Sequence, residues 1–276
     1  MSYFIDVQGT LISDKDKKPI EGSVKIIDSL NSLHIPYMVI TNNTKELSED
    51  FHNFLLGLGF DIPFENYLDP FMVLDKIVNT KEVRAFGADE FVRSLRKMGF
   101  DTNSKNPKAM LIASKKDFNS DDYASMIETA LGDVEVIGMH ATSIYAKDGR
   151  RYPGVGAILE MIKYATCKDY KIIGKPSGAF YEEAKRLLNL QQNSNIDFGD
   201  ITMISDDAIG DLCGIKELGS KTVLVLSGKC KSTDEIKPVK TQIDKIIPDI
   251  SGVEIKSEKS KETQDIKMSS MDRGDK

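Results

Sequence analysis

Short apolar runs rich in β-branched residues alternate along this chain with stretches in which apolar residues recur every three or four positions. Runs of the first kind are typical of buried β-strands, and repeats of the second kind are typical of helices that pack one face on a core. The apolar runs occupy residues 3–7, 37–40, 83–86, 109–113, 134–137, 171–173, 201–204 and 222–226. This alternation predicts an α/β fold, with a doubly wound parallel sheet covered by helices.

The helical repeats and the composition agree with a folded chain that has a sizeable core. Its 276 residues and 40% hydrophobic content suit one large domain or a core with an insert. Sets of apolar residues that share one helical face are Val24, Ile27, Leu30 and Leu33, then Phe51, Phe54, Leu55 and Leu58, and later Phe180, Ala184, Leu187 and Leu188.

The charge balance limits the partners that the chain is expected to have. A net charge of −6 and a pI near 5.3 argue against nucleic acid or an anionic membrane surface as partner. No apolar stretch approaches the ~20 residues that a membrane span needs, and the first residues lack a basic targeting segment. A small ligand fits this chain better, and a homodimer is compatible with it.

The cysteines indicate the cellular compartment of the protein, and the composition of the C-terminal segment indicates whether that segment is ordered. Cys167, Cys213 and Cys230 form an odd set without close pairing, which predicts reduced thiols and a cytoplasmic protein. Residues 255–276 are rich in Lys, Glu, Ser and Asp and contain no aromatic residue. We expect this segment to be a disordered tail, because it has too little apolar surface to offset the entropy of ordering it.

Polar residues follow four of the expected strands. Asp6, Thr41, Lys175 and Asp206 each stand just after an apolar run. In an open parallel sheet, ligands bind in the crevice beyond the carboxyl ends of the strands. Carboxylates there can hold Mg²⁺ together with a phosphoryl group, because Mg²⁺ prefers hard oxygen ligands. An ammonium and a hydroxyl can bind phosphoryl oxygens from the other side.

Four segments resemble, in order, the four motifs of the haloacid dehalogenase superfamily. They are Asp-Val-Gln-Gly-Thr-Leu at 6–11, Ile-Thr-Asn-Asn-Thr at 40–44, Gly-Lys-Pro-Ser at 174–177 and Ile-Ser-Asp-Asp-Ala-Ile-Gly-Asp at 204–211. The paired asparagines, the Gly-Lys-Pro-Ser and Arg-Tyr-Pro-Gly-Val-Gly at 151–156 resemble the NagD-like branch, whose relatives include pyridoxal phosphate phosphatase and phosphoglycolate phosphatase. The resemblance extends from about residue 3 to about residue 252.

The resemblance implies a role for each of these positions. Asp6 would be the nucleophile that forms an aspartyl-phosphate, and Lys175 would pair with Asp6 and the phosphate. Mg²⁺ would lie between the Asp6 carboxylate, the backbone carbonyl of Gln8 and Asp206, with Asp211 or Asp207 around its waters. The implied site residues are therefore Asp6, Gln8 and Lys175 for catalysis, Thr41, Asn42, Asn43 and His140 for the substrate, and Asp6, Gln8, Asp206 and Asp211 for the metal.

Three departures from the family pattern affect what the site can do. Gln8 stands where the phosphatases carry an aspartate that protonates the leaving oxygen, and glutamine has no proton to give at neutral pH. Ser205 stands where a glycine usually precedes the metal-binding aspartate. Met-His-Ala-Thr at 139–142 stands where NagD-like proteins often show Asn-Pro-Asp, and His140 in it could reach a substrate from the cap, although a lone histidine at a strand end is more often structural.

The resemblance also implies the domain organisation and the function. We expect a core at 1–74 plus 170–254 and an inserted α/β cap at 75–169. The expected function is a Mg²⁺-dependent phosphatase-like hydrolase for a small phosphorylated metabolite, weakened by Gln8. Two alternatives remain: a weak or inactive member that binds a phosphometabolite or a protein, and a receiver-type signalling domain, which the motif order and the insert disfavour. A basic run at Lys229, Lys231, Lys237 and Lys240 is interpreted as solvated surface.

Overall fold

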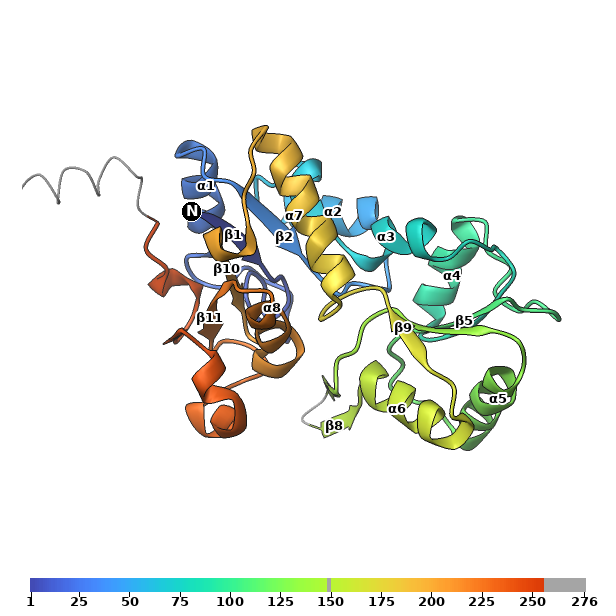
Figure 1. Ribbon diagram of the computed structural model, residues 1–276. Helices are drawn as coiled ribbons and strands as arrows, with labels where there is room; N and C mark the ends of the chain where they lie inside the picture. Colours follow the sequence, from blue (N-terminus) through green and yellow to red (C-terminus); the bar gives the residue numbers. More distant parts are fainter. Residues whose placement is uncertain (148–149, 256–276) are drawn as a thin grey trace, which may run out of the picture.

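The computed structural model describes residues 1–147 and 150–255. Apart from Ile255, the expected tail at 255–276 lies outside the described residues. Six parallel strands form the larger sheet, in the order β12-β11-β10-β1-β2-β3. Their bounds are β1 (Ser2–Ile5), β2 (Tyr37–Ile40), β3 (Tyr67–Leu68), β10 (Ile201–Ser205), β11 (Lys221–Val225) and β12 (Lys245–Ile247). The two ends of the described chain therefore share one core (Figure 1).

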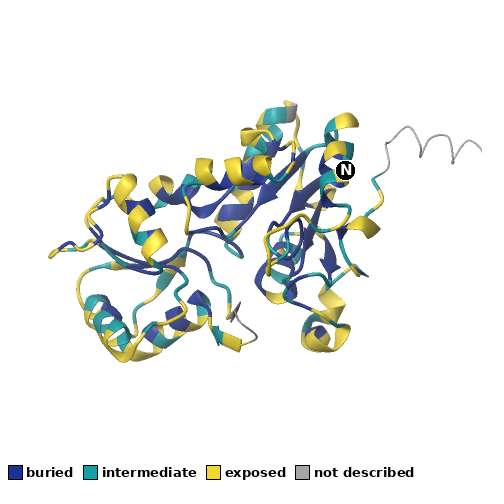
Figure 2. Cartoon of the chain, turned by 180° about the vertical axis from the view of Figure 1, so that it is seen from behind, coloured by how far each residue is buried: buried dark blue, intermediate teal, exposed yellow. Residues whose placement is uncertain are grey.

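Helices cover both faces of this sheet because successive strand residues point to opposite sides. Tyr3 and Ile5 pack with Ile27 on one face, and Phe4 packs with Phe180 on the other. Figure 2 shows the strands buried between helices whose outer sides are exposed. The first face carries α1 (Ser23–Ser32) and α2 (Ser48–Gly57), and the second carries α3 (Pro70–Ile77), α7 (Gly178–Gln192) and α8 (Cys213–Glu217).

A second, four-stranded parallel sheet is inserted between β3 and α7 and has the order β4-β5-β6-β9. Its strands are β4 (Val83–Phe86), β5 (Ala109–Ile112), β6 (Glu135–Gly138) and β9 (Tyr170–Ile172). The helix α4 (Asp89–Lys97) packs on one face, and α5 (Ser120–Leu131) and α6 (Val155–Thr166) pack on the other. A hairpin of β7 (Ile144–Lys147) and β8 (Arg150–Pro153) precedes α6. We call residues 83–172 the cap.

The predicted α/β class is confirmed, and all eight predicted strands occur. Two residues predicted for packed helical faces are exposed instead. Leu33 is 43% exposed because α1 ends at Ser32, and Phe54 is 37% exposed because the buried face of α2 centres on Phe51 and Leu55. The remaining short helices are η1 (Phe64–Asn66), η2 (Phe198–Asp200), η3 (Ala208–Leu212), η4 (Thr233–Gln242) and η5 (Ile250–Gly252).

The division into core and cap stays a prediction at its boundaries. The last cap strand, β9, ends at Ile172, three residues beyond the expected end at 169, and α3 runs across the expected boundary at 74. Hydrophobic packing is continuous between the two parts, since Phe71 of α3 stacks on Phe91 of α4.

Within the described ranges, no helix combines the length and apolar character that crossing a membrane requires.

Candidate active site

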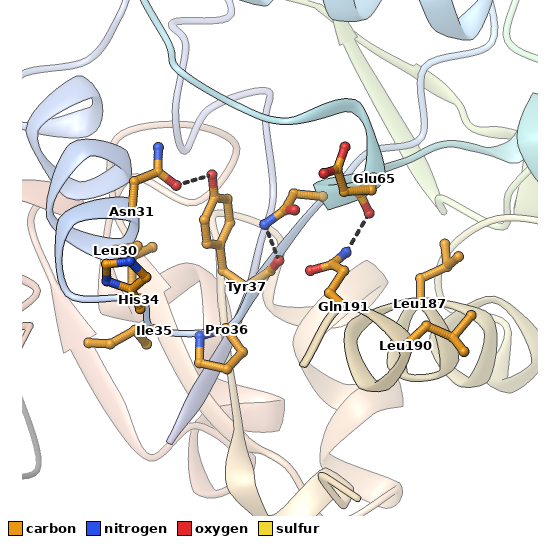
Figure 3. Close-up of a pocket in the computed structure, with 11 residues that line it drawn as sticks. Leu30, Asn31, His34, Ile35, Pro36, Tyr37, Glu65, Leu187, Leu190 and Gln191 are labelled. Atoms are coloured by element: carbon orange, nitrogen blue, oxygen red, sulfur yellow. Dashed lines mark hydrogen bonds between the residues drawn. The ribbon is translucent and has the colours of Figure 1, made fainter. Parts of the chain in front are cut away.

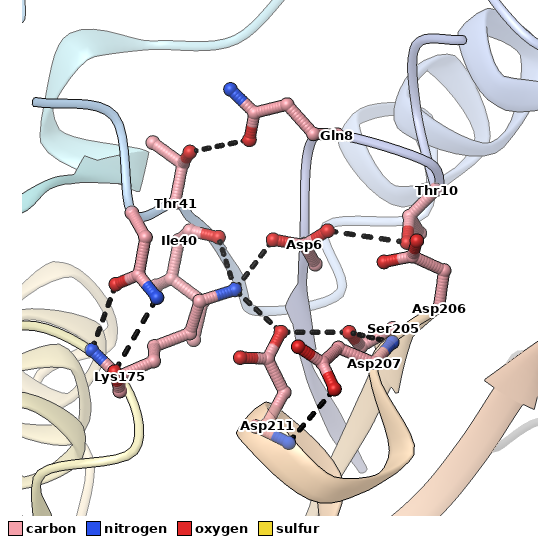
Figure 4. A network of polar contacts seen from close by, with 12 residues as sticks. Asp6, Gln8, Thr10, Ile40, Thr41, Lys175, Ser205, Asp206, Asp207 and Asp211 are labelled. Carbon is pink, nitrogen blue, oxygen red and sulfur yellow. Dashed lines mark hydrogen bonds and ion pairs between the residues drawn. The ribbon is translucent and has the colours of Figure 1, made fainter. Parts of the chain in front are cut away.

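The carboxyl ends of the central core strands bring three of the predicted motifs together. Asp6 follows β1, Thr41 follows β2 and Asp206 follows β10, and β1 pairs with both neighbours. Lys175 does not follow a core strand but lies in the segment that leads from cap strand β9 to α7. Figure 4 shows these side chains converging on one small region.

Lys175 forms the centre of this polar network. Its ammonium lies 2.5 Å from Oδ1 of Asp6 and 2.7 Å from Oδ2 of Asp211, and it donates to the backbone carbonyl of Ile40 at 3.4 Å. The side chain is 1% exposed. Although burial opposes its charge, the carboxylates of Asp211 and Asp6 raise the pKa of Lys175. Lys175 therefore stays charged and binds the carboxyl groups of Asp6 and Asp211, and its catalytic role stays a prediction.

The carboxyl of Asp6 lies in an environment that disfavours negative charge. Its pKa is raised to about 7, because burial and the charge of Asp211, which raise it, outweigh the charge of Lys175, which lowers it. Its second oxygen, Oδ2, accepts a hydrogen bond from the Thr10 hydroxyl at 3.4 Å. One oxygen of Asp6 is thus bound to the ammonium, while the other faces Thr10.

Two glycines pack closely against the carboxylate of Asp206, beside Asp6 (Figure 4). A Cβ atom on Gly9 or on Gly228 would overlap Oδ2 of Asp206, and Gly9 also has a φ of +76°, which favours glycine. The same oxygen accepts a hydrogen bond from the backbone N–H of Lys229 at 2.5 Å. Burial, and then the charge of Asp6, raise the pKa of Asp206 well above its usual range.

Ser205 and Asp207 hold Asp211 in place. The Ser205 hydroxyl donates to Oδ2 of Asp211 at 2.7 Å and accepts from the Asp207 N–H at 3.1 Å. Asp207 caps the first turn of η3 by accepting from the Gly210 N–H at 2.8 Å. The serine that replaces the usual glycine therefore contributes a hydrogen bond that glycine could not make.

Gln8 and Thr41 contact each other at one edge of the polar network (Figure 4). The Thr41 hydroxyl donates to Oε1 of Gln8 at 2.8 Å and accepts from the Asn43 N–H at 3.1 Å. A threonine has one hydroxyl proton, so binding of a phosphoryl oxygen by Thr41 would have to replace its bond to Gln8. The amide of Gln8 carries no acidic proton, which leaves this position without a titratable group.

The two asparagines that follow Thr41 make contacts within the protein. Asn42 accepts from the backbone N–H of Lys175 at 2.9 Å and donates to its carbonyl at 3.4 Å, which joins the segment that carries Lys175 to the loop after β2. Asn43 donates to the carbonyl of Glu46 at 2.9 Å and closes its own loop. Their predicted contact with the substrate stays a prediction.

His140 follows cap strand β6 and is buried. Its Nδ1 accepts from the Thr142 N–H at 3.3 Å, so the proton is on Nε2, which donates to the Ser114 hydroxyl at 3.2 Å. Burial, and then the charges of Lys229 and Lys175, lower the pKa of His140 to about 4. His140 is therefore neutral at pH 7, and its predicted contact with the substrate stays a prediction.

Three residues with contacts in this network were not predicted to act there. Thr10 and Ser205 belong to the predicted motifs but were assigned no role of their own. Thr10 follows Asp6 by four residues and Ser205 precedes Asp211 by six, and this short spacing is the one signal of their contacts in the sequence. Lys229 was interpreted as solvated surface, but its Nζ lies 2.6 Å from Oδ2 of Asp207 and its side chain is only 24% exposed. The other members of that run, Lys231, Lys237 and Lys240, are exposed as predicted.

The side chains fit a hard divalent cation such as Mg²⁺ on chemical grounds. Asp6 and Asp206 are adjacent buried carboxylates whose pKa values are both raised, and each contributes oxygen ligands of the kind that Mg²⁺ prefers. Among the residues that the structure describes, no group of three or more His, Cys, Asp or Glu side chains is arranged to hold a metal. The predicted set includes a third carboxylate, Asp211, but its Oδ2 is bonded to Lys175 and to the Ser205 hydroxyl, so Asp6 and Asp206 are the pair that lies ready for a cation.

A separate recess of about 600 Å³ lies at the opposite, amino-terminal end of β2 (Figure 3). Two of the polar side chains that line it are bonded within the protein: Tyr37 donates to Asn31 at 2.9 Å, and Gln191 donates to the carbonyl of Glu65 at 2.5 Å. The recess contains none of the predicted site residues.

Comparison with known proteins agrees with this geometry. Residues 3–101 match the family described as haloacid dehalogenase-like hydrolase, and residues 172–253 match a family described as HAD-hydrolase-like. Haloacid dehalogenase-like hydrolase domain-containing protein 2 of Bos taurus is 25% identical over 86% of this chain and 88% of its own length. Phospholysine phosphohistidine inorganic pyrophosphate phosphatase of Danio rerio is 26% identical over 85% and 84%. The structure of NagD from E. coli K-12 superposes with a TM-score of 0.72 at 19% identity, covering 92% of this chain and 98% of NagD.

The fold, the site and these matches together define the class of this protein, which is a hydrolase with an aspartate-rich site on an α/β core. More particularly, the chain belongs to the haloacid dehalogenase-like hydrolases, since the two matched segments together cover more than half of it. The predicted superfamily and the predicted fold of the NagD-like branch are confirmed. The prediction of a phosphohydrolase-type enzyme is confirmed at the level of class.

Proposed function

We propose that this chain is a Mg²⁺-dependent phosphohydrolase that acts on a small phosphorylated metabolite through an aspartyl-phosphate on Asp6. The observation that carries the proposal is the position of Asp6 at the end of β1, with Oδ1 bound by the buried ammonium of Lys175. An oriented carboxylate next to a fixed positive charge and a hydroxyl can attack phosphorus and stabilise the charge on its oxygens.

The protein's own residues would carry out the reaction in two displacements. In the first, a carboxylate oxygen of Asp6 forms a bond to phosphorus, and the bond to the leaving oxygen breaks with its electron pair. In the second, water attacks phosphorus and Asp6 is released as a carboxylate, with one proton lost to solvent. Lys175 holds the aspartate throughout, and Thr41 would donate to a phosphoryl oxygen once its bond to Gln8 is exchanged.

The Asp6 and Asp206 carboxylates, the carbonyl of Gln8 and the neighbouring Asp211 are the residues that would hold Mg²⁺. Bound there, the cation would offset the repulsion between the two carboxylates and the charge of the phosphoryl group. The raised pKa values of Asp6 and Asp206 support this assignment, because both groups lie where a nearby cation would stabilise their charged forms.

Gln8 would weaken this reaction for substrates with poor leaving groups. Without a proton donor, the leaving oxygen departs as an anion, so its own stability determines the rate of the first displacement. We therefore propose that acyl phosphates and aryl phosphates are better substrates than alkyl phosphates. We also propose a cytoplasmic location and no nucleic acid or membrane partner, and a homodimer is compatible with the proposal.

Asp6→Asn is expected to abolish turnover, because an amide neither attacks phosphorus at a useful rate nor pairs with Lys175. The measurement is phosphate release from a panel of phosphorylated metabolites, p-nitrophenyl phosphate and acetyl phosphate, with and without Mg²⁺. Asp69→Asn is the matched control, since Asp69 is an equally buried carboxyl that caps α3 and is bonded to Tyr67 and Ser48 rather than to Lys175. Equal turnover by wild type and Asp6→Asn would contradict the proposal.

Asp206→Asn is expected to weaken Mg²⁺ binding by at least about tenfold, which is the lower end of the loss seen when groups around a metal are removed. Calorimetric titration with Mg²⁺ should show one site in the wild type. The same Asp69→Asn variant should bind Mg²⁺ like the wild type. Unchanged affinity in Asp206→Asn would mean that this carboxylate is not a ligand.

A catalytically weak or inactive protein that binds a phosphometabolite or a protein partner is the second candidate. The absence of a titratable side chain at Gln8 is the observation that favours it. The two candidates differ in the turnover panel: binding of phosphate with Mg²⁺ but no hydrolysis of any activated substrate would support the second.

A further inference from the structure

Lys229 lies at the edge of the proposed site but has no role in the chemistry described so far. It belongs to the segment after β11, at the carboxyl edge of the core sheet and next to the end of β10. Its backbone N–H is bonded to Asp206 and its ammonium to Asp207. Since Gly228 packs against Asp206 without room for a Cβ atom, the backbone that carries Lys229 lies directly against this carboxylate.

The ammonium of Lys229 is bonded to the core and lies near enough to the cap for its charge to act there. Its charge and that of Lys175 act on the same cap side chain, His140. An ammonium group has three N–H donors, and one recorded bond, to Asp207 at 2.6 Å, uses one of them. With 24% of its side chain exposed, Lys229 can present its remaining donors to a ligand between core and cap.

The direction of the reaction places the leaving group on this side. Attacking and leaving oxygens lie roughly in line through phosphorus. Asp6, at the end of β1, attacks phosphorus from the side of the core sheet. The leaving group therefore departs on the opposite side, away from the core sheet and towards the cap. A fixed cation beside that path stabilises the negative charge that a leaving group develops when no acid protonates it, and Gln8 supplies no acid.

We propose that Lys229 determines specificity by binding a second anionic group on the leaving side, so that the site takes phosphoryl compounds whose leaving group is itself an anion, such as a diphosphate. This inference rests on the proposed function of Asp6. It differs from a structural role for Lys229, in which the ammonium only neutralises Asp207.

The binding of two anions that the protein does not need to hydrolyse tests the inference. Methylenediphosphonate carries the second anionic group and inorganic phosphate does not. Calorimetric titration at a fixed concentration of free Mg²⁺ gives the ratio of their affinities for wild type, Lys229→Met, Lys229→Gln, Lys229→Arg and Lys231→Met. Lys231 is the matched control, because it lies two residues away and is exposed. Two neutral variants are included so that misfolding of one leaves the comparison intact.

In both neutral variants the preference for diphosphonate over phosphate should fall by about 10- to 100-fold, the size expected for one charge-assisted hydrogen bond. Lys229→Arg should retain most of the preference, and Lys231→Met should retain all of it. An unchanged preference in the neutral variants would overturn the inference, even if their melting temperatures fall, and would leave Lys229 as a support for Asp207.

A kinetic comparison separates this inference from the proposed function. Pyrophosphate and p-nitrophenyl phosphate have leaving groups of nearly equal basicity but different charge, so the ratio of their kcat/KM values should fall in the neutral variants by a similar factor. If the wild type hydrolyses neither compound, the proposed function fails, while the binding ratio still decides whether Lys229 recognises the second anion.

Discussion

Replacing Gln8 by aspartate is expected to raise the rate of alkyl-phosphate hydrolysis by about 10²- to 10⁴-fold, the range typical of general acid–base catalysis. The new carboxyl would protonate the leaving oxygen and then take a proton from the attacking water. Alkyl phosphates should gain most, because their leaving groups are the poorest. With p-nitrophenyl phosphate the first displacement should gain less, since its leaving group needs no proton.

Gln8→Asn is the matched control for this gain. Asparagine has the length of aspartate but cannot titrate, so it separates the effect of the acid from the effect of the shorter side chain and the lost bond to Thr41. Single-turnover kinetics with both substrate classes divides the gain between the two displacements. An equal rise in Gln8→Asn, or efficient hydrolysis of alkyl phosphates by the wild type with no gain in Gln8→Asp, would contradict the role assigned to Gln8.

Lys175→Met is expected to produce the largest loss of stability together with a loss of turnover. Removing this ammonium leaves the buried carboxylates of Asp6 and Asp211 without their shared cation. Breaking a buried ion pair in this way costs about 3–5 kcal/mol in the free energy of unfolding. Urea denaturation in the absence of Mg²⁺ measures the change.

Lys76→Met provides the comparison for Lys175. Lys76 also lies 2.5 Å from a carboxylate, that of Glu183, but its side chain is 54% exposed. Exposed ion pairs contribute about 0–1 kcal/mol, so this variant should unfold almost like the wild type. A loss below about 1 kcal/mol in Lys175→Met would mean that the network around Asp6 is not held by this charge.

The strands that the sequence predicts correctly coincide with its short apolar runs, since two-sided burial in a parallel sheet requires such runs. The structure adds β3, which has two residues, β12, which begins with Lys245, and the β7–β8 hairpin with its Arg150 and Arg151. Pairing with neighbours rather than apolar content forms these elements, and a single sequence carries little signal for that.

The site was predictable where a side chain directly follows a buried strand, as for Asp6, Thr41 and Asp206. Contacts that depend on distant loops were not predictable. Lys229 stands in a polar loop near exposed lysines, and it reaches the site through the packing of Gly228 against Asp206 and its own bonds to Asp206 and Asp207. The bonds of Asn42 to the Lys175 backbone likewise join residues far apart in the sequence.

Trapping the phosphorylated enzyme tests the central claim most directly. The wild type is mixed with acetyl phosphate and Mg²⁺, quenched in acid within the first turnover and digested, and the modified peptide is identified by mass spectrometry. We expect the phosphoryl group on Asp6, more of it in the wild type than in Gln8→Asp, and none in Asp6→Asn. Hydrolysis that proceeds with no phosphoryl group on Asp6, or with the group on another residue, would contradict the assignment of Asp6 as the nucleophile.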